Sequence, residues 1–466
     1  MKDILLQKVL EELSSVKKVV KELNKKVELQ DEQIADLTSR NKVLKEEVKQ
    51  LKIKLTSKNS SKPPSSDQNQ IRKKRSLRRK TGKKSGGQKG HKGNKLKMVS
   101  TPDNIEQLWP DICERCHTDL SVQHQGVIET SRQIFDIPPM EIKVTEYQQI
   151  SVDCPCCGAM NKASFPARVK ASTQYGPNLE HLIVYLSTRQ FISMKRLTEI
   201  VKILTGQQIS EGTVVNVLER KATEITPVYY QILEQLKQSE VIGSDETGCK
   251  VNGEKYWAWV LQNQCYNFIH LSKSRGFKTL EFLCPQGLTS STVVSDRWAA
   301  QLKLSTKNKQ LCIPHLVRNV QELIDRYKCN WTISLKKVLL NIMRACREET
   351  IQPDTKRQLK KKLDKLLDKQ LNSTVNKINT FQKSLVKHRT AITTCLDNRN
   401  VPPDNNASER AIRNIKVKLK VSGGFRSFKG AQHYMIFRSI IDSAIKQGIH
   451  PFRALAKPNL LVNCTE

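Results

Sequence analysis

The sequence lacks the apolar run that a membrane helix needs, and it lacks a recognisable signal core. No stretch approaches the roughly 18 to 20 apolar residues of a membrane span. The opening segment MKDILLQKVLEEL alternates charged and apolar residues. Thirteen cysteines are spread over 466 residues without an export signal, so reduced thiols are expected instead of a disulfide framework. These absences predict a soluble protein that remains in the cytoplasm, with no membrane partner.

Acidic residues are scarce relative to basic ones. The chain has 45 Asp and Glu against 80 Lys and Arg, which leaves a formal charge of +35. Such a surface attracts a polyanion, and double-stranded DNA is the expected partner. The length allows two to four domains and the 38% hydrophobic content allows a sizeable core, so a multidomain α+β protein is expected.

The first 56 residues carry an apolar seam that is typical of a coiled coil. Apolar residues recur at alternating spacings of three and four over seven heptads without Pro or Gly. Asn41 occupies one seam position, where a buried amide favours a parallel pair. Residues 1–56 are therefore predicted to form a homodimer or a higher oligomer, and a helix packed on its own protein is the alternative. The seam consists of Leu6, Val9, Leu13, Val16, Val20, Leu23, Val27, Ile34, Leu37, Leu44, Val48, Leu51 and Leu55.

Residues 57–100 are predicted to be a disordered basic linker. The segment TSKNSSKPPSSDQNQ cannot bury enough apolar surface to order itself. Residues 71–97 then carry thirteen Lys and Arg and no acidic residue, with interleaved glycines, so that cations can follow a phosphate track. DNA contact without sequence reading is one interpretation, and a solvated tail is the other. The predicted DNA-binding residues of this linker are Arg72, Lys73, Lys74, Arg75, Arg78, Arg79, Lys80, Lys83 and Lys84.

Two pairs of cysteines predict a zinc-binding domain over residues 101–170. Cys113-x-x-Cys116 and Cys154-x-x-Cys157 flank the stretch VIETSRQIFDIPPMEIKVTEYQQISV, which has a strand-rich composition. Four thiolates can form a tetrahedron around a structural Zn²⁺, and both pairs lie beside turn-forming residues. The middle cysteine of the CPCC run is a competing ligand, and four ordinary buried thiols are the alternative.

Residues 171–238 are predicted to be helical, with the outline of a helix-turn-helix. In MKRLTEIVKILTGQQISEGTVVNVLERK one helix should end near Thr205 and Gly206, and Ser210 is the expected N-cap of the next. The second helix of such a pair can enter a DNA major groove. Any helical hairpin with a glycine turn gives the same pattern, so both interpretations remain open.

A sheet is predicted for residues 239–316 together with 397–455. VIGSDETGCKV, KYWAWVLQNQ and CYNFIHLSKS are short β-branched or aromatic runs separated by turn signals, which indicates an antiparallel meander. STVVSDRW indicates a further strand. Residues 317–396 are Lys-rich with leucines at helical spacing, and they predict a helical insertion.

Three acidic residues are candidates for a metal site. Asp245 and Asp296 each follow a short β-branched run, and Glu409 is the only glutamate between positions 350 and 465. Singly, the aspartates could end strands at turns, and Glu409 could complete a capping box in NASE. Together the three carboxylates could hold two Mg²⁺ ions, or Mn²⁺, that clamp the attacking and leaving oxygens of a phosphodiester displacement. Nucleases and transposases use this chemistry.

Other polar residues near these three have secondary interpretations. Glu246 should point to the opposite face of its strand from Asp245, so it ranks lower as a ligand, as does Asp404. His315 is interpreted as structural, because a lone histidine near a strand end more often is. Cations that follow Glu409 on its helix could hold DNA phosphates or could form a solvated face. The predicted phosphate-binding residues there are Arg410, Arg413 and Lys416.

Taken in order, these motifs resemble the insertion sequence 66 family of bacterial transposases. The resemblance rests on the zipper-like helix, SKNSSKPPSSD, GGQKGHKG, the paired C-x-x-C, SDET, VVSD, CIPHLVRN, DNNASERAIRN, GGFRSFKGA and GIHPFRAL. It implies a ribonuclease-H-like α/β catalytic core of the DDE type in which Asp245, Asp296 and Glu409 are the catalytic residues. It also implies Mg²⁺-dependent DNA cleavage and strand transfer at the terminal inverted repeats of a mobile element, at the bacterial nucleoid. Accessory proteins of the same element are a further implied partner.

Two other functions fit parts of the pattern. A catalytically inactive DNA-binding regulator derived from a transposase would keep the zipper and the zinc module. A structure-specific nuclease would cleave DNA without joining it. Short inverted repeats that bracket the gene, with a target duplication outside them, would favour the transposase.

Overall fold

The chain is represented by a computed structural model that describes residues 2–54, 90, 96–122, 125–138, 140–371 and 375–461. Two compact units are distinguished. The smaller comprises Ile71–Thr145 with Ile203–Gln207, and the larger comprises Met1–Gln70, Glu146–Lys202 and Gln208–Glu466. Among the described residues, no helix combines the length and apolar character needed to cross a bilayer.

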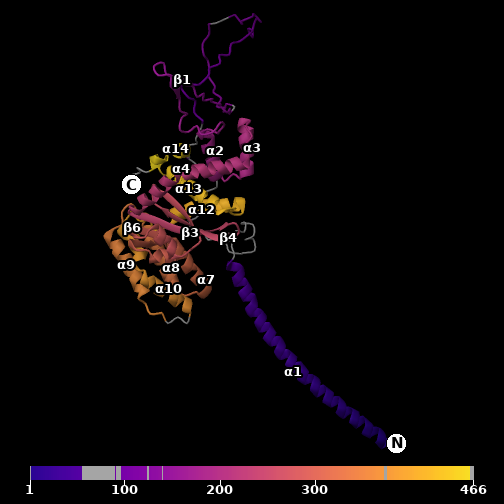
Figure 1. The fold of residues 1–466 in the computed structure, drawn as a ribbon. Coiled ribbons are helices and arrows are strands. Elements are labelled where there is room, and N and C mark those ends of the chain that lie inside the picture. Colours follow the sequence, from indigo (N-terminus) through magenta and orange to yellow (C-terminus); the bar gives the residue numbers. More distant parts are fainter. Residues whose placement is uncertain are drawn as a thin grey trace. The chain divides into compact units, whose positions relative to one another are not determined.

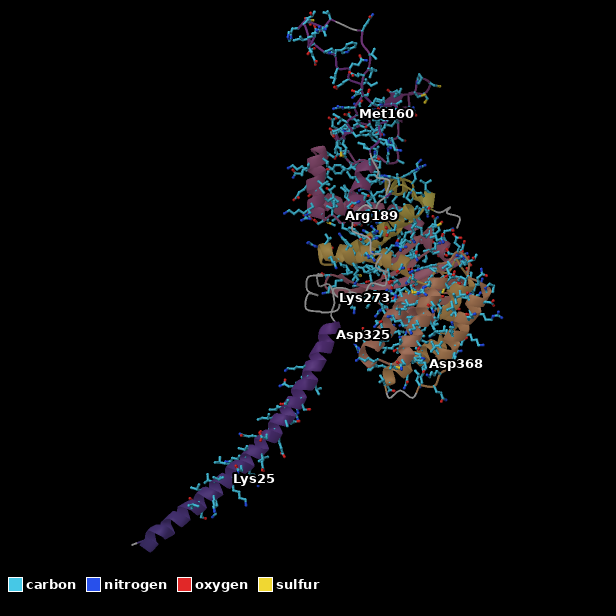
Figure 2. All side chains as sticks on the ribbon, turned by 180° about the vertical axis from the view of Figure 1, so that it is seen from behind. Lys25, Met160, Arg189, Lys273, Asp325 and Asp368 are labelled. Carbon is cyan, nitrogen blue, oxygen red and sulfur yellow. The ribbon has the colours of Figure 1, made fainter. Side chains whose placement is uncertain are left out.

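The N-terminal segment is one continuous helix, α1, over Lys2–Lys54 (Figure 1). It contains no Pro or Gly that would interrupt it. The side chains that the structure describes in α1, such as Leu23, Lys25 and Ile34, are exposed (Figure 2). The predicted helix is therefore confirmed, whereas the pairing of its apolar seam with a second copy remains a prediction. The predicted DNA-binding residues between Arg72 and Lys84 lie outside the described residues.

The stretch between the two cysteine pairs does not form the strands that its composition suggested. Residues 125–138 and 140–150 contain no strand, and Ile134 and Val144 are about nine-tenths exposed. Their apolar side chains find no sheet to pack on within the described part of the chain, so the strand prediction is wrong there. Two short strands follow, β1 over Ser151–Asp153 and β2 over Met160–Lys162, and they pair antiparallel.

The predicted pair of helices before the sheet is confirmed. After α2 (Pro177–Thr188), α3 runs over Met194–Thr205 and α4 over Glu211–Lys237. Gly206 has a φ of +70°, and the Ser210 side chain caps α4 by accepting from the Thr213 backbone N–H at 3.0 Å. Past its first turns α4 buries apolar residues such as Ile225 and Ile232 in the sheet core. The insertion of the N-terminal turns of α4 into a DNA major groove remains a prediction.

The centre of the larger unit is a five-stranded sheet with the order β5-β4-β3-β6-β7. β4 pairs antiparallel with β3 and with β5, which confirms the predicted meander, and β6 and β7 continue the sheet parallel to β3. The hairpin between β3 and β4 turns at Asn252 and Gly253, which both have positive φ, as its tight two-residue loop requires. The strands are β3 (Val241–Val251), β4 (Glu254–Gln262), β5 (Asn267–Ser272), β6 (Leu288–Ser295) and β7 (Thr306–Leu311).

Helices cover both faces of this sheet. Along β4, Trp259 and Leu261 join a core with α4, whereas Ala258 and Val260 join a core with α12. In the view of Figure 1, α4, α12 and α13 are drawn above the labelled strands β3, β4 and β6. The sheet connections and the C-terminal part supply α5 (Phe277–Leu283), α6 (Ala299–Lys303), α12 (Asn406–Ser422), α13 (Phe428–Lys446), α14 (Pro451–Ala456) and the 3₁₀ helix η2 (Pro458–Leu461).

The segment between β7 and α12 is helical, as the sequence predicts. Its helices share a core with Val294 of β6 and Leu311 of β7. The first of them begins at Ile313, before the predicted start of the insertion at residue 317, so its first turn lies directly beside the sheet. The helices are α7 (Ile313–Tyr327), α8 (Asn330–Ala345), α9 (Pro353–Leu367), α10 (Asn376–Lys387) and α11 (Thr390–Asp397).

Gly243 lies where α12 packs tightly against β3. A Cβ on Gly243 would lie 2.6 Å from Ser408 Oγ and would also meet the Gln262 amide, so any side chain would push α12 away. We expect Gly243→Ala to lower the free energy of unfolding by about 1 to 3 kcal/mol, measured by urea denaturation. Gly248→Ala in the same strand is the matched control, because its Cβ would meet only the Trp257 ring at 3.7 Å. Equal losses in the two variants would contradict close docking at Gly243.

Candidate active site

The sheet register places Asp245 and Asp296 side by side. Ser244 of β3 pairs with Ser295 of β6 in a parallel ladder, and each aspartate is the next residue. Neighbouring strands lie about 4.8 Å apart, so the two residues are neighbours at the sheet end where β6 stops. Ser295 also pairs with Leu311 of β7, which puts Cys312 in the next place of the same row. Asp296 directly follows the end of its strand, as predicted. The prediction that Asp245 ends its strand is wrong, because β3 continues to Val251, paired with β4.

Glu409 reaches this end of the sheet from the first turn of α12. The helix is held there by Asn405, whose side-chain amide donates to Ser244 O at 2.8 Å, and by the Ile313 N–H, which donates to Pro403 O at 2.9 Å. The helix begins at Asn406 with Asn405 as its N-cap, and no side-chain hydrogen bond caps it. The capping-box alternative for Glu409 is therefore wrong.

The three carboxylates interact electrostatically. Burial raises the pKa of Asp245 to about 8, and the negative charges of Asp296 and Glu409 add to this rise. Oδ1 of Asp296 is buried and has no hydrogen-bond partner within the described residues. Mutual repulsion of this kind indicates a site that lacks its counter-charge, and a divalent cation would supply it.

Two residues from the first turns of α7 complete the cluster, and the sequence did not assign them a role. His315 Nδ1 lies 2.8 Å from Asp296 Oδ1, close enough for an ion pair but not aligned for a hydrogen bond, and its Nε2 lies 3.6 Å from Glu409 Oε1. Arg318 donates to Glu409 Oε1 at 3.2 Å. The structural interpretation of His315 does not account for this position between two carboxylates. Its spacing from Arg318, three residues along one helix, was the available signal.

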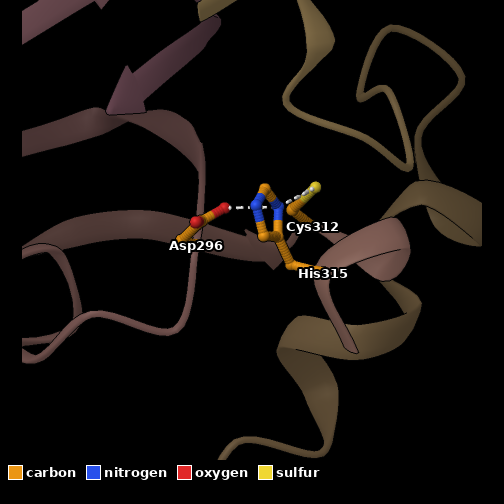
Figure 3. A group of neighbouring side chains, drawn as sticks. All are labelled: Asp296, Cys312 and His315. Atoms are coloured by element: carbon orange, nitrogen blue, oxygen red, sulfur yellow. Dashed lines mark hydrogen bonds and ion pairs between the residues drawn. The ribbon is translucent and has the colours of Figure 1, made fainter. Parts of the chain in front are cut away.

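Cys312 lies against the same histidine. Its Sγ is 3.1 Å from His315 Nδ1 (Figure 3). The same sulfur accepts a hydrogen bond from the Asn405 backbone N–H at 3.3 Å. Burial raises the pKa of this thiol to about 12. The thiol is therefore protonated at neutral pH in the absence of a metal.

Glu246 has a different set of partners, as its place on the strand predicts. Its carboxylate accepts from the Arg275 guanidinium at 2.8 Å and from the Gln301 amide at 2.7 Å. Arg275 stacks on the Trp298 ring at 3.6 Å. Asp404, the other secondary candidate, accepts from the Asn406 backbone N–H at 3.0 Å. Both carboxylates are satisfied by local contacts.

The predicted phosphate-binding cations on α12 differ in exposure and in hydrogen bonding. Arg410 and Arg413 are exposed. Lys416 donates to Gly248 O at 3.2 Å, and burial lowers its pKa. The two arginines are available to a phosphate, whereas the Lys416 ammonium already has a backbone acceptor.

The two C-x-x-C loops have the same backbone geometry. In the smaller unit, Cys113 O accepts from the His117 N–H at 2.9 Å, and in the larger unit Cys154 O accepts from the Gly158 N–H at 2.8 Å. Both closing residues have positive φ. Hydrogen bonds lower the pKa of two of the thiols: the Thr118 side chain lowers that of Cys116 to about 7, and backbone N–H groups, that of Cys157 foremost, lower the pKa of Cys154. Such loops favour the thiolates that zinc requires.

Comparison with known families identifies the class of protein. Residues 110–158 match the zinc-finger binding domain of transposase IS66, which supports a structural zinc, and residues 11–97 match a family of unknown function, DUF6444. No curated protein is significantly similar to the chain. Residues 172–433, more than half of the chain, match a family of transposases, so the protein is a transposase, an enzyme of DNA transposition. That family is the Transposase IS66 family, and the chain belongs to it.

The residues at the sheet end fit divalent magnesium. Asp245, Asp296 and Glu409 offer hard carboxylate oxygens, which Mg²⁺ prefers. Oδ1 of Asp296 is buried without a hydrogen-bond donor, and the buried Asp245 carboxyl is surrounded by other negative charges, so a cation would stabilise both. We therefore treat these three side chains as the ligands that Mg²⁺ would have.

The raised pKa of Asp245 predicts a pH dependence of stability. Its pKa is about 8 in the folded protein and about 3.9 in an unfolded chain, so the metal-free folded state retains a proton that the unfolded state releases. The stabilisation from this proton is present below pH 4 and is lost as the pH rises to about 8. We expect the melting temperature of metal-free protein to fall more steeply over this range than that of Asp245→Asn. Parallel curves would rule out a buried protonated Asp245.

Proposed function

We propose that the chain is a DDE transposase that binds the terminal inverted repeats of its insertion sequence and catalyses Mg²⁺-dependent cleavage and strand transfer. Asp245, Asp296 and Glu409 are the proposed catalytic and metal-binding residues. The observation that carries the proposal is the sheet register that sets Asp245 beside Asp296, with Glu409 near enough for its charge to raise the pKa of Asp245. Asp296 and Glu409 lie 51 and 164 positions further along the chain than Asp245, so only the fold brings their charges close to this buried carboxyl.

We further propose that the sheet domain is ribonuclease-H-like. The first three strands form a meander, and the fourth and fifth lie parallel to the first on its other side. The first carboxylate lies on the first strand, the second follows the fourth strand, and the third lies on a later helix. This order supports the DDE assignment, because Asp245 is set beside Asp296 by the pairing of β3 with β6 and Glu409 is close enough to act on the Asp245 charge.

Each side chain has a distinct role in the proposed mechanism. Bound Mg²⁺ would supply an activated water or 3′-hydroxyl and would stabilise the leaving oxygen at phosphorus. The charges of both other carboxylates act on Asp245, so its carboxylate would hold divalent cations together with theirs. Arg318 and His315 orient Glu409, and the exposed Arg410 and Arg413 can bind phosphates that flank the scissile bond.

The remaining parts are proposed to hold DNA and to pair subunits. A net charge of +35 favours DNA as the partner, and the basic linker, with Lys73 and Arg78 among its cations, is proposed to follow its backbone. Cys113, Cys116, Cys154 and Cys157 are the proposed ligands of the structural zinc. Helix α1 is proposed to form a homodimer or higher oligomer through its exposed apolar seam, and element-encoded accessory proteins could join. Membership of a transposase family does not favour an inactive regulator.

The test is incubation of the purified chain with labelled duplexes that carry the ends of its element and with a target plasmid. We expect nicked ends and joined products with Mg²⁺ or Mn²⁺, and neither with Ca²⁺ or EDTA. Duplexes with scrambled ends are the control. Cleavage without joined product would instead indicate a structure-specific nuclease, and DNA binding without cleavage would contradict the enzymatic function.

A further inference from the structure

Cys312, His315 and Asp296 each direct one potential ligand atom to a common point. Sγ of Cys312 lies 3.1 Å from Nδ1 of His315, and this nitrogen lies 2.8 Å from Oδ1 of Asp296 (Figure 3). All three atoms lie within 4.8 Å of one another, and no other such group of His, Cys, Asp or Glu is found within the described parts of the chain. We propose that this group is a second metal site, for a borderline-soft cation such as Zn²⁺.

The spacing fits tetrahedral coordination after a small expansion. Zinc binds sulfur at about 2.3 Å and nitrogen or oxygen at about 2.0 to 2.2 Å, which separates neighbouring ligand atoms by about 3.3 to 3.6 Å at the tetrahedral angle. The two observed separations, 3.1 and 2.8 Å, are shorter by roughly half an ångström. Repulsion between ligands that lose their protons, and the cation itself, would open the group by this amount.

The ligand types separate this site from the proposed magnesium site. A thiolate and an imidazole nitrogen select Zn²⁺, Co²⁺ or Cu over Mg²⁺, which prefers oxygen ligands in an octahedron. His315 is partly exposed, so a cation can reach the group from solvent on the side of its imidazole. Three protein ligands leave a fourth position for water.

The fold presents these ligands from rigid elements. Cys312 is the N-cap of α7 and His315 lies in the first turn of the same helix. The Cys312 N–H donates to Ser295 O at 2.9 Å, which ties the start of α7 to the strand that precedes Asp296. A site on such supports needs little rearrangement to bind an ion.

Binding of zinc at this group should affect the enzyme, because one of its ligands, Asp296, is also a proposed magnesium ligand. Asp296 belongs to both sites, and His315 also contacts Glu409, so a bound Zn²⁺ withdraws Asp296 from magnesium. Zinc is therefore expected to inhibit the reaction in competition with Mg²⁺. This consequence rests on the proposed function, whereas metal binding by itself does not.

The alternative role of Cys312 is purely structural, since its Sγ accepts the Asn405 N–H. Cys312→Ser separates the two roles, because a hydroxyl oxygen keeps the acceptor and loses the soft ligand. Cys329→Ser is the matched control, since Cys329 is likewise the N-cap of a helix, α8, and belongs to no such group. His315→Gln is a second variant that removes a partly exposed ligand, and it serves if Cys312→Ser does not fold.

The binding test uses the full chain loaded with a single equivalent of Zn²⁺, the amount that the zinc finger holds. This protein is titrated with Co²⁺, and binding is measured by thiolate-to-cobalt charge-transfer absorption. We expect one additional Co²⁺ per chain in the wild type and in Cys329→Ser, and loss of this absorption in Cys312→Ser and His315→Gln. The zinc finger contributes equally to all four proteins. Absorption that is absent from the wild type, or that persists in both ligand variants, overturns the proposal.

The activity test measures DNA cleavage in a fixed Mg²⁺ concentration with added Zn²⁺. For each protein we compare the Zn²⁺ concentration that halves its own zinc-free cleavage rate. We expect this concentration to be at least about tenfold higher for Cys312→Ser than for the wild type. Equal inhibition of both proteins overturns the inhibitory consequence. If no cleavage occurs in Mg²⁺ alone, the proposed function fails, and the cobalt titration still decides the metal site.

Discussion

Asp245→Asn is expected to reduce DNA cleavage and strand transfer by at least about 10³-fold while leaving DNA binding nearly unchanged. The amide keeps the shape of the side chain but removes the charge that two cations would share. Asp245 is the carboxyl that both Asp296 and Glu409 influence, so its loss should affect both ions. Cleavage of labelled element ends under single-turnover conditions measures the chemical step, and a band-shift titration measures binding.

The control for this variant is Asp404→Asn. Asp404 lies close in sequence to Glu409, but its carboxylate accepts a hydrogen bond from the Asn406 backbone N–H. Its cleavage rate should stay within about threefold of the wild type. Asp296→Asn and Glu409→Gln should behave as Asp245→Asn does. Full activity in any of these three variants would remove that residue from the proposed mechanism.

Neutralising the basic linker should have the largest effect on DNA affinity. Replacing its nine predicted DNA-binding Lys and Arg residues by Gln removes charges that would release counterions on binding. The slope of log affinity against log salt should become shallower by up to about 8, and affinity near 0.1 M salt should fall on the order of 10³-fold. Fluorescence anisotropy with a random duplex measures both, because the linker is proposed to bind without reading sequence.

The matched control changes only Arg72, Arg75, Arg78 and Arg79 to Lys, so that the charge is kept. Its salt slope should equal that of the wild type. An unchanged slope in the neutralised variant would show that the linker is a solvated tail, which is the alternative interpretation of the same composition.

The parts of the site that could be predicted are those with a local signal. Asp245 and Asp296 follow short β-branched runs, and such runs specify strands whatever lies elsewhere in the chain. Glu409 was placed by its helix and by the scarcity of other glutamates, although the alternative of a capping box depended on a local hydrogen bond that the structure does not contain.

His315 and Arg318 could not be assigned in this way, because their partners are distant in sequence. Arg318 contacts Glu409 across 91 positions, and that contact exists only because the start of α12 docks beside the start of α7. The strand prediction for the stretch between the cysteine pairs was wrong for a related reason. A β-branched composition favours a strand only where a partner strand is present to satisfy it.

Manganese binding tests the central claim most directly. The account holds that Asp245, Asp296 and Glu409 together bind paired divalent cations. Electron paramagnetic resonance of free Mn²⁺, with element-end DNA present, should give about two bound ions per chain for the wild type and a loss of at least one for Asp245→Asn. Equal Mn²⁺ binding by the wild type and by a variant with all three carboxylates neutralised would contradict the account.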